Sequence, residues 1–152
     1  MELKFTVFAH VSRPVEEVFE AVADPAKLSA YFTTGGANGR LASGATVEWD
    51  FHDFPGAFPV EVVEAVENER IVLRWDANEA GGKAGYKTTV TFRFLALQGN
   101  TRTKVEIAEE GWRATQAGLD ASYGNCMGWA QMLAALKLWV ERGINLREGM
   151  YK

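Results

Sequence analysis

The N-terminal part of the chain changes its hydrophobic period from two residues to about 3.6. From residue 3 to residue 9 every second side chain is apolar, and this alternation predicts a half-buried strand. Ser12 is placed to cap a helix and Pro14 suits its first turn. Apolar side chains then recur at helical spacing: Val15, Val18, Phe19 and Val22. Asp24-Pro25 repeats the pattern of a cap followed by proline, and predicts a second short helix that ends near Phe32.

The central part of the chain alternates repeatedly between apolar and polar side chains, after a glycine-rich turn at 35–39. The alternate apolar positions of four strand-like runs are Val47, Trp49 and Phe51; Ile71, Leu73 and Trp75; Val90, Phe92 and Phe94; and Val105 and Ile107. The run 58–66 is also strand-like, but Pro59 favours an edge position or a bulge there. Residues 76–85 contain three glycines and are expected to form a mobile loop, whereas Gln98-Gly99-Asn100 predicts a turn. The spacing indicates an antiparallel meander.

A long amphipathic helix is predicted from roughly Asp120 to Arg142, with Gly143 placed to end it. Its inner stripe is large and apolar in the C-terminal half, with Trp129, Met132, Leu133, Leu136 and Val140. Continued backwards, the stripe meets small or polar side chains, namely Ser122, Asn125 and Cys126. Gly124 and Gly128 are expected off this stripe, where they weaken the helix locally.

The element order and the composition together predict one α+β domain spanning residues 1–152. Helices at the two ends of an antiparallel sheet are typical of that class, and 47% hydrophobic with 24% charged residues is ordinary for a globular chain. A net charge of −4 without basic clusters gives no reason to expect nucleic acid or a membrane as partner. A cytoplasmic location is expected, because the N-terminus lacks the basic start and the apolar run of a signal peptide.

Several local sequences resemble the START-like (SRPBCC) superfamily, and most closely the branch named after the C-terminal domain of the heat-shock-protein ATPase activator. They lie at Val11–Phe19, Asp24–Phe32, Arg70–Trp75, Thr89–Phe92, Gly128–Lys137 and Glu141–Arg147. The resemblance covers almost the whole chain and implies a helix-grip fold, in which a curved antiparallel sheet wraps around a long C-terminal helix and two short helices follow the first strand. It also implies a cavity between sheet and helix. It does not choose a function, because members range from lipid carriers to cyclases and co-chaperones.

The aromatic content predicts what would line such a cavity. Five Trp and nine Phe exceed what a small core requires, and rigid aromatic walls suit a flat or acyl ligand. The expected ligand-binding side chains are Phe32, Trp49, Phe51, Leu73, Trp75, Phe92, Trp112, Ser122, Asn125, Trp129, Met132 and Leu133. Two alternatives stay open: the aromatic side chains simply fill the core, and the polar pair Ser122 and Asn125 lies at a frayed, solvated start of the helix.

The polar residues give little support for catalysis or metal binding. His10 and His52 fall on the outward strand faces and are expected at the surface, although His52 with Asp53 is kept as an acid–base alternative. Glu109 and the other strand carboxylates are expected on a solvated face. With two histidines and one cysteine, Cys126, no metal site is expected. Motifs for a nucleophile or a nucleotide cofactor are not found, so no cofactor is expected either.

The leading hypothesis is a binding or carrier domain, without catalysis, for a small apolar molecule of acyl, aromatic or polyketide-like structure. One alternative is an enzyme of the cyclase or dehydratase type, which would use the same pocket and an inward-pointing titratable side chain. Another is a co-chaperone-like protein-interaction module, whose surface would include the off-pattern apolar side chains Phe8, Val72, Leu95 and Leu138. The same side chains lead us to expect a homodimer.

Overall fold

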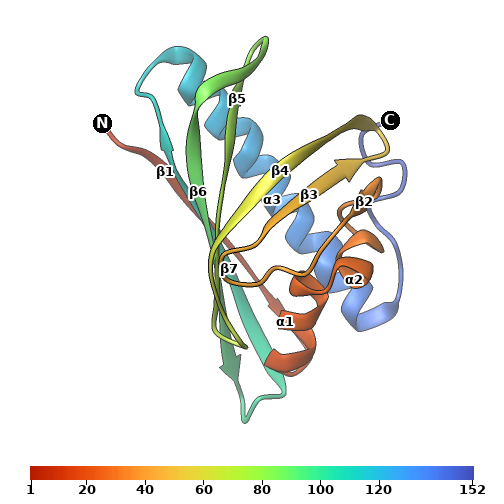
Figure 1. Cartoon of the computed structure of the whole chain (residues 1–152). Coiled ribbons are helices and arrows are strands. Elements are labelled where there is room, and N and C mark those ends of the chain that lie inside the picture. Colours follow the sequence, from red (N-terminus) through yellow and green to blue (C-terminus); the bar gives the residue numbers. More distant parts are fainter.

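The computed structural model describes residues 1–152 and consists of a curved antiparallel sheet and three helices (Figure 1). Seven strands form the sheet in the order β1-β7-β6-β5-β4-β3-β2. Their bounds are β1 Leu3–Val11, β2 Gly36–Ala37, β3 Thr46–Phe51, β4 Phe54–Val66, β5 Arg70–Glu79, β6 Gly82–Leu97 and β7 Arg102–Trp112. The helices are α1 Val15–Ala23, α2 Pro25–Ser29 and α3 Gln116–Arg142. The predicted α+β helix-grip architecture is confirmed.

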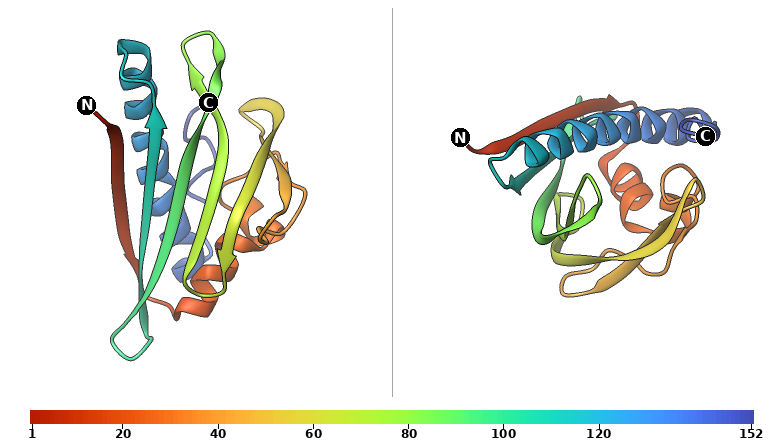
Figure 2. Two further views of the ribbon diagram at one scale, coloured as in Figure 1. Left: turned by 60° about the vertical axis from the view of Figure 1, so that its left-hand side comes forward. Right: turned by 90° about the horizontal axis from the view of Figure 1, so that it is seen from above.

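The sheet curves around one side of α3 (Figure 2). Seen from above, α3 runs along the open side of the curve beside β1, and the two short helices lie within the opening. Strands from β2 to β7 pair antiparallel with their neighbours in the chain, and β1 pairs with β7, with Val7 opposite Ile107. The meander expected from the alternating sequence is confirmed, and its inner face turns toward α3.

The two short helices are capped differently. α1 follows Pro14 and has no side-chain cap, and Ser12 instead donates its backbone N–H to Glu141 at 2.8 Å. The predicted capping role of Ser12 is therefore wrong. Asp24 does cap α2, because its carboxylate accepts the backbone N–H of Lys27 at 3.0 Å. Pro25 lies in the first turn of α2 as predicted, whereas Pro14 is itself the extended residue before α1, so its predicted place in the first turn is wrong.

α3 begins at Gln116, about one turn before the predicted start. Thr115 caps it with a hydroxyl that accepts a backbone N–H of the first turn at 3.0 Å, and Gly143 ends it in the left-handed conformation with φ of 68°. Ser122 and Asn125 consequently lie well inside the helix, and the alternative of a frayed, solvated start is wrong. None of the helices has both the length and the apolar composition needed to cross a bilayer.

The expected mobile loop at 76–85 is instead the tip of a β-hairpin. β5 continues to Glu79, which lies opposite Gly82 at the start of β6. So tight a turn is allowed because Gly81 and Gly82 adopt positive φ values of 105° and 113°. The glycines that suggested flexibility therefore build the turn.

β4 and β5 separate at one end of the sheet (Figure 1). Their pairing runs from Val66 opposite Arg70 only as far as Glu61 opposite Arg74. The earlier part of β4 is paired with β3 alone, and it contains Pro59. Because proline has no N–H to donate, a singly paired stretch is where it fits, as the sequence predicted. The separation leaves an opening in the sheet.

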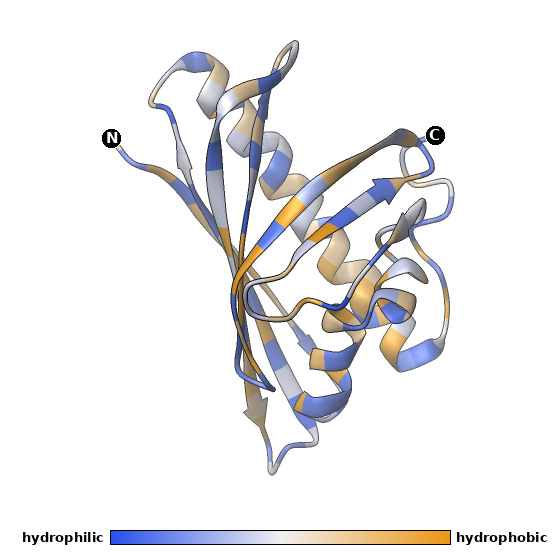
Figure 3. Ribbon diagram, in the orientation of Figure 1, coloured by the Kyte–Doolittle hydropathy of each residue, from blue (hydrophilic) through white to orange (hydrophobic).

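The apolar core is concentrated toward one end of the molecule. It contains 27 buried side chains from the sheet, the two short helices and the C-terminal half of α3. In Figure 3 the hydrophobic colours gather where the strands converge, whereas the β5–β6 hairpin and the N-terminal half of α3 carry more hydrophilic colour. The change in character along α3 that the sequence predicted is thus matched by a change in how fully the sheet and helix pack.

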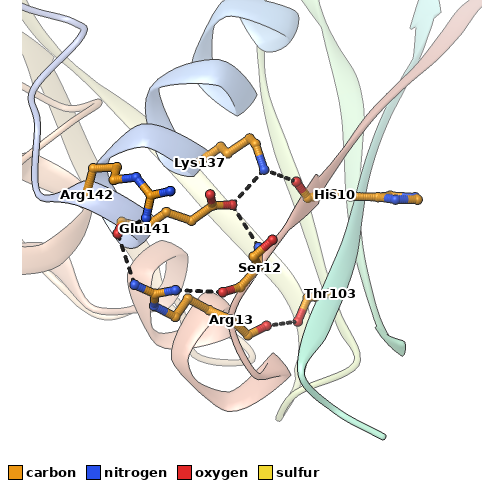
Figure 4. A network of polar contacts seen from close by, with 7 residues as sticks. All are labelled: His10, Ser12, Arg13, Thr103, Lys137, Glu141 and Arg142. Atoms are coloured by element: carbon orange, nitrogen blue, oxygen red, sulfur yellow. Dashed lines mark hydrogen bonds and ion pairs between the residues drawn. The ribbon is translucent and has the colours of Figure 1, made fainter. Parts of the chain in front are cut away.

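Polar contacts fix the C-terminal end of α3 to the connection between β1 and α1 (Figure 4). Glu141 accepts hydrogen bonds from Lys137 Nζ at 2.6 Å and from the Ser12 N–H at 2.8 Å. Lys137 also donates to the carbonyl oxygen of His10, and Arg13 donates to the carbonyl oxygen of Glu141. Burial acts to raise the pKa of Glu141, but these hydrogen bonds lower it overall. The contacts hold this half of α3 against the sheet.

Candidate functional site

Glu109 is a buried carboxylate on the inner face of β7. It continues the row of inward-facing side chains that contains Val105 and Ile107, and it is only 1% exposed. The expectation that it lies on a solvated face is wrong. Alternation along the strand places residue 109 on the same face as 105 and 107, and only its charge argued for the outside.

Four side chains donate hydrogen bonds to the carboxylate of Glu109. Oε1 accepts from Trp129 Nε1 at 2.8 Å and from Asn125 Nδ2 at 3.1 Å. Oε2 accepts from Thr88 Oγ1 at 2.7 Å, Trp75 Nε1 at 3.0 Å and Asn125 Nδ2 at 3.1 Å. Each oxygen has at least two donors, which fills the directions of its lone pairs. The carboxylate thereby connects β5, β6 and β7 to α3.

Burial raises the pKa of Glu109 above its ordinary value of 4.5, because it penalises the charged form. The hydrogen bonds from Trp75, Thr88, Trp129 and Asn125 act in the opposite direction and limit the rise. All four donors are neutral, so the charge is stabilised by dipoles and not by an ion pair.

An apolar pocket of about 350 Å³ lies beside this carboxylate, between the sheet and the middle of α3. We call it the inner pocket. Its walls are Phe32, Phe51, Phe54, Trp75, Gly124, Asn125, Met127, Gly128, Trp129, Met132, Arg147, Met150 and Tyr151. Three of these side chains, Trp75, Asn125 and Trp129, are donors to Glu109. The carboxylate therefore lies behind the polar part of an otherwise apolar wall and orients it.

A second cavity of about 440 Å³, the outer pocket, adjoins the first at Phe51, Trp75 and Asn125. Its remaining walls come from the start of β4 and from the β5–β6 hairpin: Gly56, Ala57, Phe58, Pro59, Asp76, Asn78 and Lys83. It lies where β4 and β5 no longer pair. Asn125 thus stands at the junction of an apolar pocket and a more polar one.

Two glycines of α3 form part of the wall of the inner pocket. Gly124 is exposed and Gly128 half-buried, as expected for positions off the inner stripe, and both line the pocket beside that stripe. A Cβ at either position would meet no atom within 4 Å, whereas a Cβ at Gly118 in the same helix would lie 2.0 Å from the carbonyl oxygen of Arg113. Packing therefore requires glycine at 118 but not at 124 or 128. The two missing side chains leave the pocket wall open.

The residues after α3, 143–152, fold back over the pocket and are held by a buried ion pair. Arg147 donates to both carboxylate oxygens of Asp53, at 2.6 and 2.7 Å, and the two side chains are 4% and 2% exposed. This hydrogen-bonded guanidinium lowers the pKa of Asp53. The Arg147 guanidinium also lies 4.5 Å from the ring centre of Tyr151, which approaches Phe54. We call residues 143–152 the C-terminal cover.

Half of the side chains predicted to bind a ligand line the inner pocket: Phe32, Phe51, Trp75, Asn125, Trp129 and Met132. Four others fill the core instead, namely Trp49, Leu73, Phe92 and Leu133. Ser122 is buried, but its hydroxyl donates to a carbonyl oxygen one turn earlier in α3. Trp112 stacks on Phe5 at the edge of the sheet formed by β1. The alternation along a strand identifies which side chains face inward, but it does not say whether an inward side chain lies in the core or in a pocket.

The pocket also contains residues that the sequence did not point to. Met127 lies next to the expected helical stripe, and Phe54 begins β4. Arg147, Met150 and Tyr151 belong to the C-terminal cover. No local pattern predicts that Arg147 meets Asp53, because 94 positions separate them. Glu109 is different, since the alternation of β7 was sufficient to place it.

The histidines lie outside the pocket. His52 is exposed and its Nδ1 lies 2.6 Å from the hydroxyl of Thr34, and the His10 ring points away from α3 in Figure 4. Asp53 is bonded to Arg147 and not to His52, so the acid–base pair suggested by their adjacency is not formed. No group of three or more His, Cys, Asp or Glu side chains is placed to hold a metal ion.

A curved antiparallel sheet closed by a long C-terminal helix, with a pocket between them, defines the helix-grip class of the START-like superfamily. Residues 12–141 match the model of the family described as Activator of Hsp90 ATPase homolog 1-like protein, and the chain belongs to that family. No curated protein matches its sequence.

Solved structures agree with this assignment of the fold. The protein SSP2350 from Staphylococcus saprophyticus is similar with a TM-score of 0.78 and 22% identity, over 95% of this chain and 96% of that chain. The Aha1 dimer from Colwellia psychrerythraea gives 0.75 and 18%, over 93% and 98%. DynU16, from the dynemicin biosynthetic locus, gives 0.76 and 24%, over 95% of this chain and 49% of that chain. Likeness at such identities establishes the fold alone.

Proposed function

We propose that this protein binds a small, largely apolar molecule in the inner pocket and does not transform it. The observation that carries the proposal is that the apolar wall on α3 is open at Gly124 and Gly128, where larger side chains would fit. The volume of about 350 Å³ lies within the usual range for small-molecule sites. Gly124 and Gly128 keep the wall open although each costs the helix about 1 kcal/mol relative to alanine.

The aromatic side chains of the pocket favour a ligand with a flat ring system. The rings of Trp75 and Trp129 stack with centroids 5.5 Å apart, and Phe32 lies 5.6 Å from Trp129. Both indole N–H groups are bonded to Glu109, so the orientation of both rings is determined before a ligand arrives. Preorganised aromatic surfaces bind flat apolar molecules with little loss of side-chain entropy.

The enzymatic alternative requires an inward-pointing titratable group, and two buried carboxylates are candidates. Glu109 accepts from four side chains, and its lone pairs are engaged. Asp53 is paired with Arg147 through both oxygens. Glu109 therefore has no free lone pair for a substrate proton, and Asp53 lines neither pocket, so neither carboxylate is placed to act as a general base. We therefore favour binding over a cyclase or dehydratase, although DynU16 belongs to a biosynthetic locus.

The proposal is tested by native mass spectrometry of freshly purified protein, compared with the same sample after denaturation and extraction. We expect a co-purifying organic molecule that is lost on unfolding. Gly128→Leu fills the pocket wall and is expected to abolish the adduct, whereas Ala134→Leu, on the exposed side of α3, is expected to keep it. A folded wild-type protein that binds neither a cellular molecule nor an added apolar aromatic compound would refute the proposal.

The homodimer remains part of the proposal. A dimeric Aha1 structure is among the similar folds, and Phe8 and Leu95 are 61% and 43% exposed, whereas Val72 and Leu138 are half-buried. We propose self-association through the outer sheet face that carries Phe8 and Leu95, which light scattering of the wild type and Phe8→Ser would test. A stress-related co-chaperone role would use the same face. The cytoplasmic location stays a prediction from the sequence.

A further inference from the structure

The orientation of the Asn125 side chain follows from its contact with Glu109. Nδ2 lies 3.1 Å from both carboxylate oxygens, and an ionised carboxylate can only accept. The amide must therefore present its N–H₂ end to Glu109 and direct Oδ1 elsewhere. Because Glu109 is itself held by Trp75, Thr88 and Trp129, the amide cannot turn over without losing this contact.

Oδ1 of Asn125 has no partner within the protein, although Nδ2 has two. The side chain lines both pockets at their junction. Around it the inner walls are aromatic or apolar apart from Arg147, which is engaged by Asp53. Asn125 is half-buried, so the pocket offers a hydrogen-bond acceptor with a determined direction that a ligand can reach.

The charges near the junction disfavour an acidic ligand. Arg147 is neutralised by Asp53, and Lys83 lies 3.5 Å from Asp76. Glu109 is buried immediately behind Asn125 and has only neutral partners. A ligand carboxylate at the junction would therefore lose its hydration and face a carboxylate, whereas the ammonium of Lys152 lies over Phe54, which lines only the inner pocket. A neutral donor group meets none of these costs.

We infer that the ligand carries a neutral hydroxyl donor on its ring system, and that this hydroxyl is bound by Oδ1 of Asn125. The inference rests on the proposed binding function and names the chemical class of its ligand, a flat hydroxylated aromatic compound. Glu109 is a positioning residue, since it acts on the ligand only through the side chains that it orients, Asn125 and the rings of Trp75 and Trp129. The ring occupies the inner pocket, and the hydroxyl lies at the junction with the outer pocket.

The test compares three probes of one ring system by equilibrium dialysis at pH 7: 2-naphthol, 2-methoxynaphthalene and 2-naphthoate. Wild-type protein is expected to bind 2-naphthol about tenfold more tightly than 2-methoxynaphthalene, the value of one net hydrogen bond, and to bind 2-naphthoate most weakly. Asn125→Leu removes the acceptor at similar size and is expected to bring the first ratio close to one.

Glu109→Gln supplies a second, independent variant. Its side-chain amide no longer forces the orientation of Asn125, so the ratio of the 2-naphthol affinity to the 2-methoxynaphthalene affinity should fall toward one. Any loosening of the Trp75 and Trp129 rings lowers both affinities and leaves this ratio unchanged. A general loss of structure would lower both affinities together.

Equal binding of 2-naphthol and 2-methoxynaphthalene to the wild type would overturn the inference and leave the binding function standing. A tenfold preference that survives in Asn125→Leu would overturn the assignment to Asn125. Failure of all three probes to bind would contradict the binding function, and the inference with it.

Discussion

At Glu109 the protein keeps a carboxylate in a place where most proteins keep an apolar side chain. The dehydration of a buried charge costs several kcal/mol in real proteins, and here it is offset by donors and not by a cation. Trp75 and Trp129 give their indole N–H groups, so two large rings that face the pocket are oriented by one residue. The dehydration of Glu109 thus costs some stability, and in return the carboxylate orients two rings in the wall of the inner pocket.

Glu109→Gln is expected to lower the free energy of unfolding by about 1–3 kcal/mol at pH 7, because the new amide cannot accept from all the donors and leaves buried N–H groups unpaired. The measurement is urea denaturation. Glu110→Gln, at the exposed neighbouring position, serves as the control and should change stability little.

The free energy of unfolding of the wild type and that of Glu109→Gln should depend differently on pH. The folded pKa of Glu109 is raised above 4.5, so between 4.5 and that pKa the native state binds more protons than the unfolded state. The contribution of Glu109 to the stability of the wild type is therefore greatest below pH 4.5 and falls as pH rises from 4.5 to the folded pKa. The advantage of the wild type over Glu109→Gln should narrow with rising pH, and an advantage that widened would contradict the raised pKa.

At the scale of the element, α3 performs two tasks along its length. Its C-terminal half packs on the sheet and is fixed there by Glu141 and Lys137. The middle of the helix carries Gly124, Asn125 and Gly128, which form the pocket wall. One helix can combine these tasks because the first half need not pack closely where the second half already holds it in place.

Two glycines of α3, Gly118 and Gly128, should respond in opposite ways to replacement by alanine. Gly128→Ala should raise the free energy of unfolding by about 1 kcal/mol, since alanine favours the helix and its Cβ meets no atom within 4 Å. Gly118→Ala should instead lower it by about 1–3 kcal/mol, because its Cβ would overlap the carbonyl oxygen of Arg113. Chemical denaturation of the two variants measures both values. A loss of stability at Gly128 would show that the pocket wall is packed differently, and a gain at Gly118 would show that the start of α3 is packed differently.

At the scale of the whole molecule, the C-terminal cover joins the end of the chain to the turn between β3 and β4. Arg147 and Asp53 are the contact that closes it, and the cover contributes three side chains to the pocket. Asp53→Asn would leave Arg147 buried without its counter-charge, which costs about 3–5 kcal/mol if the guanidinium stays in place. Detachment of the cover avoids most of this cost, because residues 143–152 follow the last helix.

We therefore expect Asp53→Asn to release the cover without unfolding the sheet. Amide hydrogen exchange should become at least about tenfold faster in residues 143–152, with little change in β5 to β7. Glu148→Gln, an exposed substitution in the same segment, is the control. Because Arg147 lowers the pKa of Asp53 below 3.8, the contact is complete above that pH and is lost as pH falls through the folded pKa. In the wild type, the protection of residues 143–152 from amide hydrogen exchange should therefore decrease as pH falls through the folded pKa of Asp53.

The order of the elements and the faces of the strands were readable in the sequence, because alternation and helical periodicity are local properties of the chain. They correctly placed Trp75 and Phe51 on the inner face and Trp129 on the helix stripe. Applied without regard to charge, the same rule would have placed Glu109 inside. What misled was the assumption that a carboxylate lies outside, which holds only when no set of donors is available to satisfy it.

Only the tertiary structure decided where the inner face of the sheet and α3 leave a cavity between them. Trp49 and Trp75 both face inward and their ring centres lie 5.9 Å apart, yet Trp49 fills the core, whereas Trp75 lines both pockets where β4 and β5 no longer pair. The pairing of Arg147 with Asp53 and the opening between β4 and β5 likewise depend on contacts between distant segments. The sequence by itself determined which side each residue faces. The cavity depends on the space left between surfaces, which no local pattern encodes.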